Sequence, residues 1–265
     1  MDLGLKDAKA VVVGGSAGMG LAAARCLAED GARVAIIGRR KDLLDDAVAE
    51  LEQCGSPEAI ALVTDVQDVD QVRIAFDEVA QRWRGELNIL VNAVGSYVIG
   101  TFEDLTDKEW EQSINQGAMG MVHCVRSALP LLRQAEWARI VNFSAHSTQR
   151  QSTILPAYTA AKAMVNSISK NLSLSLAKDE ILVNVVSPGS FASEGLLNWA
   201  DSVGVDGKDP YALMAAIDEH FGHPAHLPRA GDPDEIGPVV AFLASRRNSY
   251  MTGANVNVDG GSDFT

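Results

Sequence analysis

The sequence has little cysteine, a shortage of positive charge and no long apolar run, and each of these excludes a class of protein. Its 3 cysteines, Cys26, Cys54 and Cys124, are odd in number and widely separated. They give no basis for a disulfide framework or a cysteine-ligated metal, and we expect inert thiols. Lys and Arg number 22 against 35 Asp and Glu, a formal net charge of −13. This charge argues against nucleic acid or an anionic membrane as a partner.

No apolar stretch approaches the roughly 20 residues that a membrane-spanning helix needs. Residues 1–7 also lack the basic and apolar segments of a signal peptide, so we expect a soluble cytoplasmic protein. The chain has 265 residues, of which 47% are hydrophobic. This is enough for one large domain with a buried core. No linker or internal repeat divides the chain, so we predict a single domain over residues 1–265.

A glycine-rich turn follows the first apolar run. Residues 11–20 read VVVGGSAGMG, a short β-branched run that breaks into glycines before a helical pattern begins. Where a strand, a turn and a helix N-terminus meet, backbone N–H groups and the helix dipole can face a phosphate, and glycine lets the ligand approach closely. Glycine spacing alone is a weak indication, so the context of the turn has to decide whether it binds a nucleotide.

Strand and helix patterns alternate along the chain. Apolar runs predict strands covered on both faces, at residues 11–13, 34–37, 59–63, 87–91, 139–144, 181–186 and 255–258. Helical spacing of apolar residues predicts helices between them, at residues 21–28, 42–53, 69–83, 106–132, 158–177 and 234–244. We therefore predict an α/β fold, a doubly wound parallel sheet of the Rossmann kind, with ligands at the C-terminal ends of the strands.

Residues 190–229 interrupt this alternation with nearly forty residues that have no strand pattern. Long excursions of this kind are often lids or binding loops, so we predict a substrate lid within the domain. Its Trp199, Tyr211, Met214 and Phe221 favour a bulky, largely apolar substrate. The same side chains could instead pack a subunit contact.

Three histidines in this stretch have a spacing that could suggest a metal. They are His220, His223 and His226, and Gly222 and Pro224 lie between them. Glycine and proline spoil the presentation of ligands on a helix, so we predict no bound metal.

Six short motifs stand in order on these elements. They are the glycine turn with Val13 before it, Asn92-Ala93-Val94-Gly95, Tyr158-Thr159-Ala160-Ala161-Lys162, Pro188-Gly189, Thr252-Gly253 and Asp259-Gly260-Gly261. Together they resemble the motifs of the short-chain dehydrogenase/reductase family, although Val13 stands where the family has threonine. The resemblance covers nearly the whole chain. It implies a nicotinamide cofactor and a homo-oligomer, a tetramer or a dimer.

Tyr158 and Lys162 lie four residues apart and should share one face of a helix. A nearby ammonium group stabilises phenolate over phenol, so it should lower the pKa of Tyr158 toward working pH. Such a tyrosine can give or take the proton of an alcohol. The resemblance further implies that Lys162 holds the nicotinamide ribose.

The end of the second strand discriminates between the two dinucleotides, because a carboxylate there binds the ribose hydroxyls and repels a 2′-phosphate. Here Gly38 takes that place, and Arg39 and Arg40 follow it. A guanidinium group suits a phosphate, so we predict NADP(H) in preference to NAD(H). The alternative is that both arginines are solvated charges leading into a helix.

The resemblance assigns the remaining contacts of the cofactor. Asp65 and Val66 should flank the adenine. The other expected residues line the phosphates and the nicotinamide end: Gly14, Ser16, Ala17, Gly18, Met19, Gly20, Asn92, Ala93, Gly95, Pro188, Gly189, Phe191 and Ser193.

Two catalytic residues of the family are absent. Counting thirteen back from Tyr158, where the family has a serine, gives Ala145, and counting thirteen back from Pro130, where it has an asparagine, gives Gly117. Ser147 would project to the same side as Ala145 if the backbone stayed extended, whereas Ser144 would project to the opposite side. Ser147, Ser144 or a water molecule could therefore replace the missing hydroxyl, and Ser147 is our candidate.

These residues favour an NADP(H)-dependent oxidoreductase that moves a hydride between the nicotinamide and a carbonyl or secondary alcohol carbon. Tyr158 would act as acid and base, helped by Lys162 and Ser147. Two alternatives remain. Ala145 and Gly117 would also suit a dinucleotide-binding protein with little or no turnover, and a third possibility is reduction of an activated C=C bond.

Overall fold

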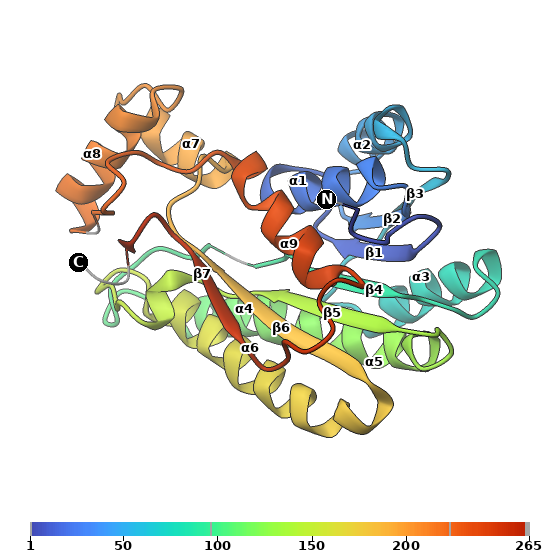
Figure 1. Ribbon diagram of the computed structural model, residues 1–265. Coiled ribbons are helices and arrows are strands. Elements are labelled where there is room, and N and C mark those ends of the chain that lie inside the picture. Colours follow the sequence, from blue (N-terminus) through green and yellow to red (C-terminus); the bar gives the residue numbers. More distant parts are fainter. Residues whose placement is uncertain (1, 96, 223, 263–265) are drawn as a thin grey trace.

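All seven apolar runs form strands of one parallel sheet (Figure 1). The computed structural model describes residues 2–95, 97–222 and 224–262. Its strands are β1 (Lys9–Val13), β2 (Arg33–Gly38), β3 (Ala59–Val63), β4 (Ile89–Asn92), β5 (Ala138–Phe143), β6 (Ile181–Pro188) and β7 (Asn255–Val258). Their order is β3-β2-β1-β4-β5-β6-β7. The chain reverses direction across the sheet beside β1, which opens a crevice at the carboxyl ends of β1 and β4. The predicted doubly wound α/β fold is confirmed.

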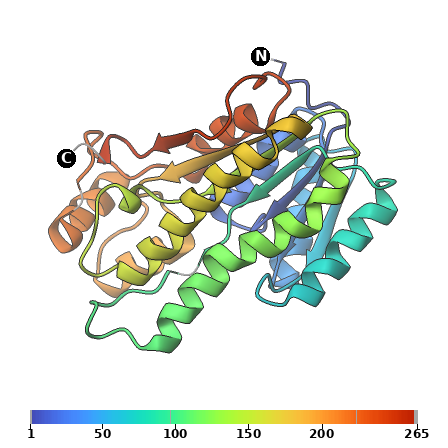
Figure 2. The ribbon, with the colours of Figure 1, turned by 90° about the horizontal axis from the view of Figure 1, so that it is seen from below.

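Helices cover both faces of the sheet (Figure 1). One face carries α1 (Gly18–Glu29), α2 (Lys41–Cys54) and α9 (Gly237–Ala244). The other carries α3 (Val69–Arg82), α4 (Asp107–Ser113), α5 (Gly120–Leu132) and α6 (Pro156–Ser175). Seen from below, α3, α5 and α6 lie across the strands (Figure 2). The β-branched and leucine side chains of the strands are thus buried on both sides, as expected for a parallel sheet.

The helix predicted over residues 106–132 is interrupted, although it begins where the sequence predicts. Thr106 and Glu109 form a capping box, in which the Thr106 N–H donates to the Glu109 carboxylate at 2.8 Å. After α4 the backbone widens into a π-helical turn, Ile114–Met119, before α5 begins. At the start of α5 the helix packs tightly, since a Cβ on Gly120 would lie 2.6 Å from Val66 Cγ2.

Two further helices, α7 (Glu194–Ser202) and α8 (Pro210–Phe221), lie in residues 190–229, which contain no named strand in their described part. They pack against each other through a small apolar cluster that includes Ala200, Leu213 and Ile217. This cluster is separate from the two cores that face the sheet. The segment is therefore a small unit with its own core, and it stands at the end of the sheet where the strands carry their carboxyl termini (Figure 1).

Candidate active site

The turn between β1 and α1 exposes its backbone to a cavity. Gly14 has a φ of 80°, and a Cβ there would lie 2.9 Å from the carbonyl oxygen of Ala93. A Cβ on Gly20 would lie 2.1 Å from the carbonyl oxygen of Gly14. Both positions therefore require glycine. The N-cap of α1, Ala17, has no side-chain cap, so the N–H groups of the first helical turn remain available to a ligand.

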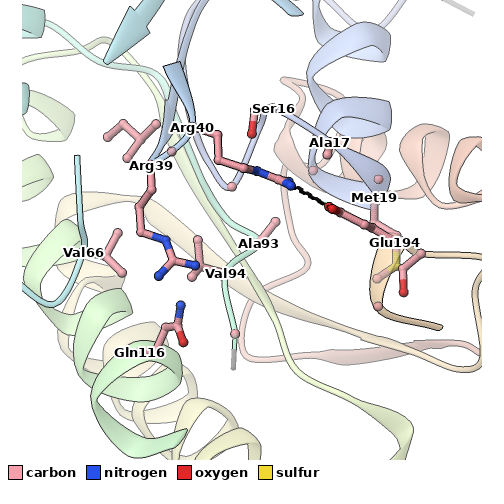
Figure 3. A pocket seen from close by; sticks show the side chains of 18 of the residues that line it. Ser16, Ala17, Met19, Arg39, Arg40, Val66, Ala93, Val94, Gln116 and Glu194 are labelled. Atoms are coloured by element: carbon pink, nitrogen blue, oxygen red, sulfur yellow. Dashed lines mark hydrogen bonds and ion pairs between the residues drawn. The ribbon is translucent and has the colours of Figure 1, made fainter. Parts of the chain in front are cut away.

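The cavity at this turn has a volume of about 490 Å³ (Figure 3). Most residues that the sequence assigns to the cofactor line it together: Gly14, Ser16, Ala17, Gly18, Met19, Gly20, Arg39, Arg40, Asp65, Val66, Ala93, Gly95 and Ser193. Thr64, Gln116 and Glu194 also line it and were not predicted. They come from the end of β3, the π-helical turn and the start of α7, so only the folded arrangement brings them to the cavity.

Arg39 and Arg40 point in different directions from the end of β2 (Figure 3). Arg39 extends toward Val66 and Gln116, and it makes no hydrogen bond or ion pair with another described residue. Arg40 reaches across the cavity and donates to both carboxylate oxygens of Glu194, each at 2.8 Å. This bond raises the pKa of Arg40 and lowers the pKa of Glu194.

A second cavity of about 380 Å³ adjoins the first. Five residues line both cavities: Met19, Ala93, Gly95, Ser193 and Gly195. The second cavity contains all three predicted catalytic residues, Tyr158, Lys162 and Ser147, together with Pro188, Gly189 and Phe191. The two cavities thus join the glycine turn to the predicted catalytic residues along the carboxyl edge of the sheet.

Asn92 lies beneath this edge and lines neither large cavity. Its side chain is buried, and its amide Nδ2 donates to Asn142 Oδ1 at 2.8 Å. Asn142 in turn donates to Ser169 Oγ at 2.8 Å. Asn92 therefore belongs to a buried polar chain that joins β4, β5 and α6, below the place where the cofactor was expected.

Lys162 is held by backbone carbonyl groups. Its ammonium group donates to the carbonyl oxygens of Phe143 at 2.9 Å and Val94 at 3.3 Å. Gly95 leaves room for it, because a Cβ there would lie 3.0 Å from Lys162 Nζ. Burial lowers the pKa of Lys162 to about 8.

Tyr158 does not have the lowered pKa that the helix spacing suggests. Desolvation raises its pKa, and the neighbouring Tyr97 adds to the effect. The two tyrosine rings meet edge to face with centroids 5.3 Å apart. The charge of Lys162 favours phenolate, but the burial of the phenol opposes ionisation and outweighs it. Tyr158 is therefore held as a neutral phenol.

Ser147 lines the second cavity as predicted, but the backbone conformation that places it there differs from the predicted one. The backbone after β5 does not stay extended, because His146–Thr148 form a 3₁₀ turn. Within this turn Ser147 is buried and accepts a hydrogen bond from the hydroxyl of Thr159 at 3.0 Å. Ala145 lines the cavity without offering a donor.

Ser144 faces α6, and its hydroxyl donates to the carbonyl oxygen of Lys162 at 3.2 Å. It also lines the second cavity. Its proton is thus directed at the helix backbone, whereas the proton of Ser147 has no acceptor among the described residues.

Gly117 lies in the π-helical turn and adjoins a cavity of about 10 Å³ that Asn92 also lines. A Cβ on Gly117 would meet only Ala161 Cβ, at 3.5 Å, which is an ordinary contact. The Oδ1 atom of Asn92 is buried and has no partner among the described residues. The space is enough for about one water molecule.

The aromatic residues of the predicted lid do not line the second cavity. The rings of Trp199 and Phe221 lie 4.6 Å apart, and Met214 is buried in the cluster between α7 and α8. Tyr211 is 59% exposed. These side chains stabilise the lid segment itself, so they do not support an apolar substrate.

Other large apolar or aromatic side chains line the second cavity, among them Tyr97, Leu155, Phe191 and Leu196. Of these four, only Phe191 was predicted from the sequence. Tyr97 follows β4 by a few residues, in the region where ligands bind to this kind of sheet, and that position was the available signal.

The remaining structural findings concern metals and membranes. Across residues 2–95, 97–222 and 224–262, no group of three His, Cys, Asp or Glu side chains lies close enough to hold a metal ion. His223, part of the histidine triplet, lies outside these residues. None of the helices in the same ranges has the length and apolar character that a bilayer crossing requires. Burial raises the pKa of the Cys124 thiol to about 12.

Comparison with known proteins agrees with this geometry. Residues 13–263 match the family described as Enoyl-(Acyl carrier protein) reductase. The chain is 30% identical over 252 residues to the 3-oxoacyl-(acyl-carrier-protein) reductase FabG of Staphylococcus aureus, covering 95% of this chain and 96% of that one. It is 30% identical over 263 residues to the 2,3-dihydro-2,3-dihydroxybenzoate dehydrogenase of Bacillus subtilis, covering 98% of this chain and 97% of that one.

Among solved structures, L-sorbose reductase from Gluconobacter frateurii, complexed with NADPH and L-sorbose, superposes with a TM-score of 0.92. It is 28% identical in sequence, and the match covers 99% of this chain and 98% of that one. The similarity of fold therefore extends over nearly the whole chain.

Proposed function

The chain belongs to the short-chain dehydrogenase/reductase family of NAD(P)-dependent oxidoreductases, and we propose that it prefers NADP(H) and reduces a carbonyl compound to an alcohol. The observation that carries this proposal is the continuity of the two cavities. One end has the glycine turn and Arg39, and the other has Tyr158 and Lys162.

The first cavity fits a dinucleotide. Gly14 and Gly20 leave no room for a Cβ beside the cavity, and the uncapped first turn of α1 can donate N–H groups to a diphosphate. Arg39 supplies a guanidinium group with no other partner among the described residues, at the place where a 2′-phosphate would be received. The NADPH complex of the structural relative adds support for this cofactor.

Bound NADPH supplies the hydride. Tyr158 gives the proton to the oxygen of the carbonyl group, and its raised pKa suits that direction because the phenol stays protonated at working pH. Lys162 would bind a ribose hydroxyl group through the ammonium hydrogen that its bonds to Phe143 and Val94 leave. Ser147 provides a second hydrogen bond to the carbonyl oxygen, in place of the serine that Ala145 replaces.

The second cavity favours a substrate without charge. Among the described residues, no acidic side chain lines it, and its basic side chains are His146 and Lys162, of which Lys162 donates to two backbone carbonyl groups. Tyr97, Leu155 and Phe191 provide an apolar wall. We propose a neutral ketone or aldehyde of moderate size.

The test is NADPH oxidation with a panel of ketones, aldehydes, ketoses and one conjugated enone. We expect turnover of a carbonyl substrate, and a loss of about 10² to 10⁴-fold for Tyr158→Phe with unchanged NADPH affinity. Full activity of Tyr158→Phe would exclude this mechanism. Saturation of the enone C=C bond without carbonyl reduction would favour the alternative that the matched family description suggests.

Localisation and assembly are part of the same proposal. We propose a cytoplasmic homo-oligomer, a tetramer or a dimer. Light scattering on the purified protein measures the mass directly, and a monomer would contradict the assembly.

A further inference from the structure

The ion pair between Arg40 and Glu194 joins two distant parts of the chain across the cofactor cavity (Figure 3). Arg40 is the N-cap residue of α2 and the second residue after β2, and Glu194 is the first residue of α7. Both carboxylate oxygens accept from the guanidinium group at 2.8 Å. This pairing engages one of the two arginines that a 2′-phosphate could use.

The ion pair is exposed to solvent, so another anion can replace Glu194 as the partner of Arg40. The side chain of Arg40 is 48% exposed and that of Glu194 is 56% exposed. Exposed ion pairs contribute little to stability, because solvent and salt screen the attraction between the charges. A phosphate carries more charge than a carboxylate and makes strong charge-assisted bonds with a guanidinium group. A phosphate at the end of β2 can therefore displace Glu194 from Arg40, but it has to compete for it.

Arg39 is in a different situation. It lines the same cavity, points away from Glu194, and makes no hydrogen bond or ion pair with a described residue. A phosphate that binds Arg39 displaces nothing. The two adjacent arginines thus differ in availability, and the difference comes from the carboxylate on α7.

We propose that Glu194 is a specificity-determining residue that weakens the preference for NADP(H) by competing with the 2′-phosphate for Arg40. The inference rests on the proposed NADP(H)-dependent function and adds a division of roles to it. Arg39 receives the phosphate, and Arg40 is shared with Glu194. NAD(H) has no 2′-phosphate and leaves the ion pair intact, so the competition affects only the phosphorylated cofactor.

The test measures the dissociation constants of NADPH and NADH by quenching of tryptophan fluorescence, for the wild-type protein and for Glu194→Gln. Glutamine keeps the shape of the side chain and removes its charge. We expect the NADPH constant to fall about three- to fivefold, in line with an exposed ion pair, and the NADH constant to stay within twofold. In a protein that already carries Arg40→Gln, adding Glu194→Gln should leave the ratio of the NADPH and NADH dissociation constants unchanged.

A control separates this competition from a general change in charge. Glu136 is 77% exposed and pairs with Arg246, so Glu136→Gln removes the same charge at another ion pair and should leave both constants unchanged. The inference would be overturned if Glu194→Gln changed the NADPH and NADH dissociation constants equally. It would also be overturned if Glu194→Gln still increased NADPH affinity in the Arg40→Gln protein.

Arg39→Gln distinguishes the inference from the function on which it rests. A loss of NADPH affinity in this variant, with an unchanged ratio in Glu194→Gln, would overturn the role of Glu194 and leave the proposed cofactor intact. If Arg39→Gln and Arg40→Gln both left NADPH affinity unchanged, the proposed NADP(H) preference would fail, and the role of Glu194 with it.

Discussion

The ammonium group of Lys162 lies 5.8 Å from the centroid of the Tyr158 ring, over its face. Its hydrogen bonds go to the carbonyl oxygens of Phe143 and Val94. Burial lowers the pKa of Lys162 to about 8 and raises the pKa of Tyr158. Burial thus shifts the pKa of each side chain in the direction of its neutral form, and the pH dependence of the protein follows from these two shifts.

The free energy of unfolding should rise with pH between about 8 and 10 because of Lys162. Its pKa falls from 10.5 to about 8 on folding, so the unfolded chain binds more protons in this interval and folding gains with pH. The gain is on the order of 2 to 3 kcal/mol. Above pH 10 the raised pKa of Tyr158 has the opposite effect, and stability should fall.

Urea unfolding at several pH values compares the wild-type protein with Lys162→Met. The variant should lack the rise in stability above pH 8. A rise of equal size in both proteins would show that another group is responsible.

Ser147→Ala should reduce kcat by about 10²-fold if this hydroxyl binds the carbonyl oxygen in the transition state. Ser144→Ala is the matched control, since that hydroxyl donates to the Lys162 carbonyl, and it should reduce kcat less. Steady-state kinetics with the best carbonyl substrate measures both. An unchanged kcat in Ser147→Ala would instead favour an ordered water molecule as the second donor.

Gly117→Ala should stabilise the protein by about 0.5 to 1 kcal/mol, because alanine restricts the unfolded chain and fits the helix. Its Cβ would meet only Ala161 Cβ, at 3.5 Å. Gly120→Ala, three residues later, should destabilise by about 1 to 3 kcal/mol, since its Cβ would lie 2.6 Å from Val66 Cγ2. Thermal unfolding of both variants checks the contrast, and equal effects would contradict the tight packing at Gly120.

Arg150→Met should loosen the end of the lid segment. Arg150 donates to the carbonyl oxygens of Gly222 at 2.7 Å, Pro224 at 3.3 Å and Ser262 at 3.2 Å. The variant should raise KM several-fold with a smaller change in kcat and should be cleaved faster by a protease near Gly222. Unchanged KM and cleavage would mean that these bonds do not hold the lid.

The sheet could be predicted because each strand is a short apolar run and each helix has a regular apolar stripe. Tyr158 and Lys162 could be paired because helix geometry fixes their spacing. The π-helical turn, Ile114–Met119, could not be predicted from the same stripe, because one wider turn shifts the pattern only slightly.

The features that the sequence did not predict depend mostly on contacts between distant parts of the chain. Glu194 and Arg40 are 154 residues apart, and no local pattern connects them. The pKa of Tyr158 rises through a burial that only the packed structure provides. Trp199 and Phe221 indicated a binding surface from composition alone, although they pack against each other.

The order of the strands also determines when the cofactor cavity can exist. Its first wall, from Gly14 to Val66, is synthesised early, but Ala93 and Gly95 belong to the other half of the sheet and Glu194 to a segment beyond it. The N–H of Ala93 bonds to the carbonyl oxygen of Val13 only when β4 has docked on β1. A nascent chain released after three strands would lack the cavity, so cofactor binding requires both halves of the sheet and the start of α7 to be in place.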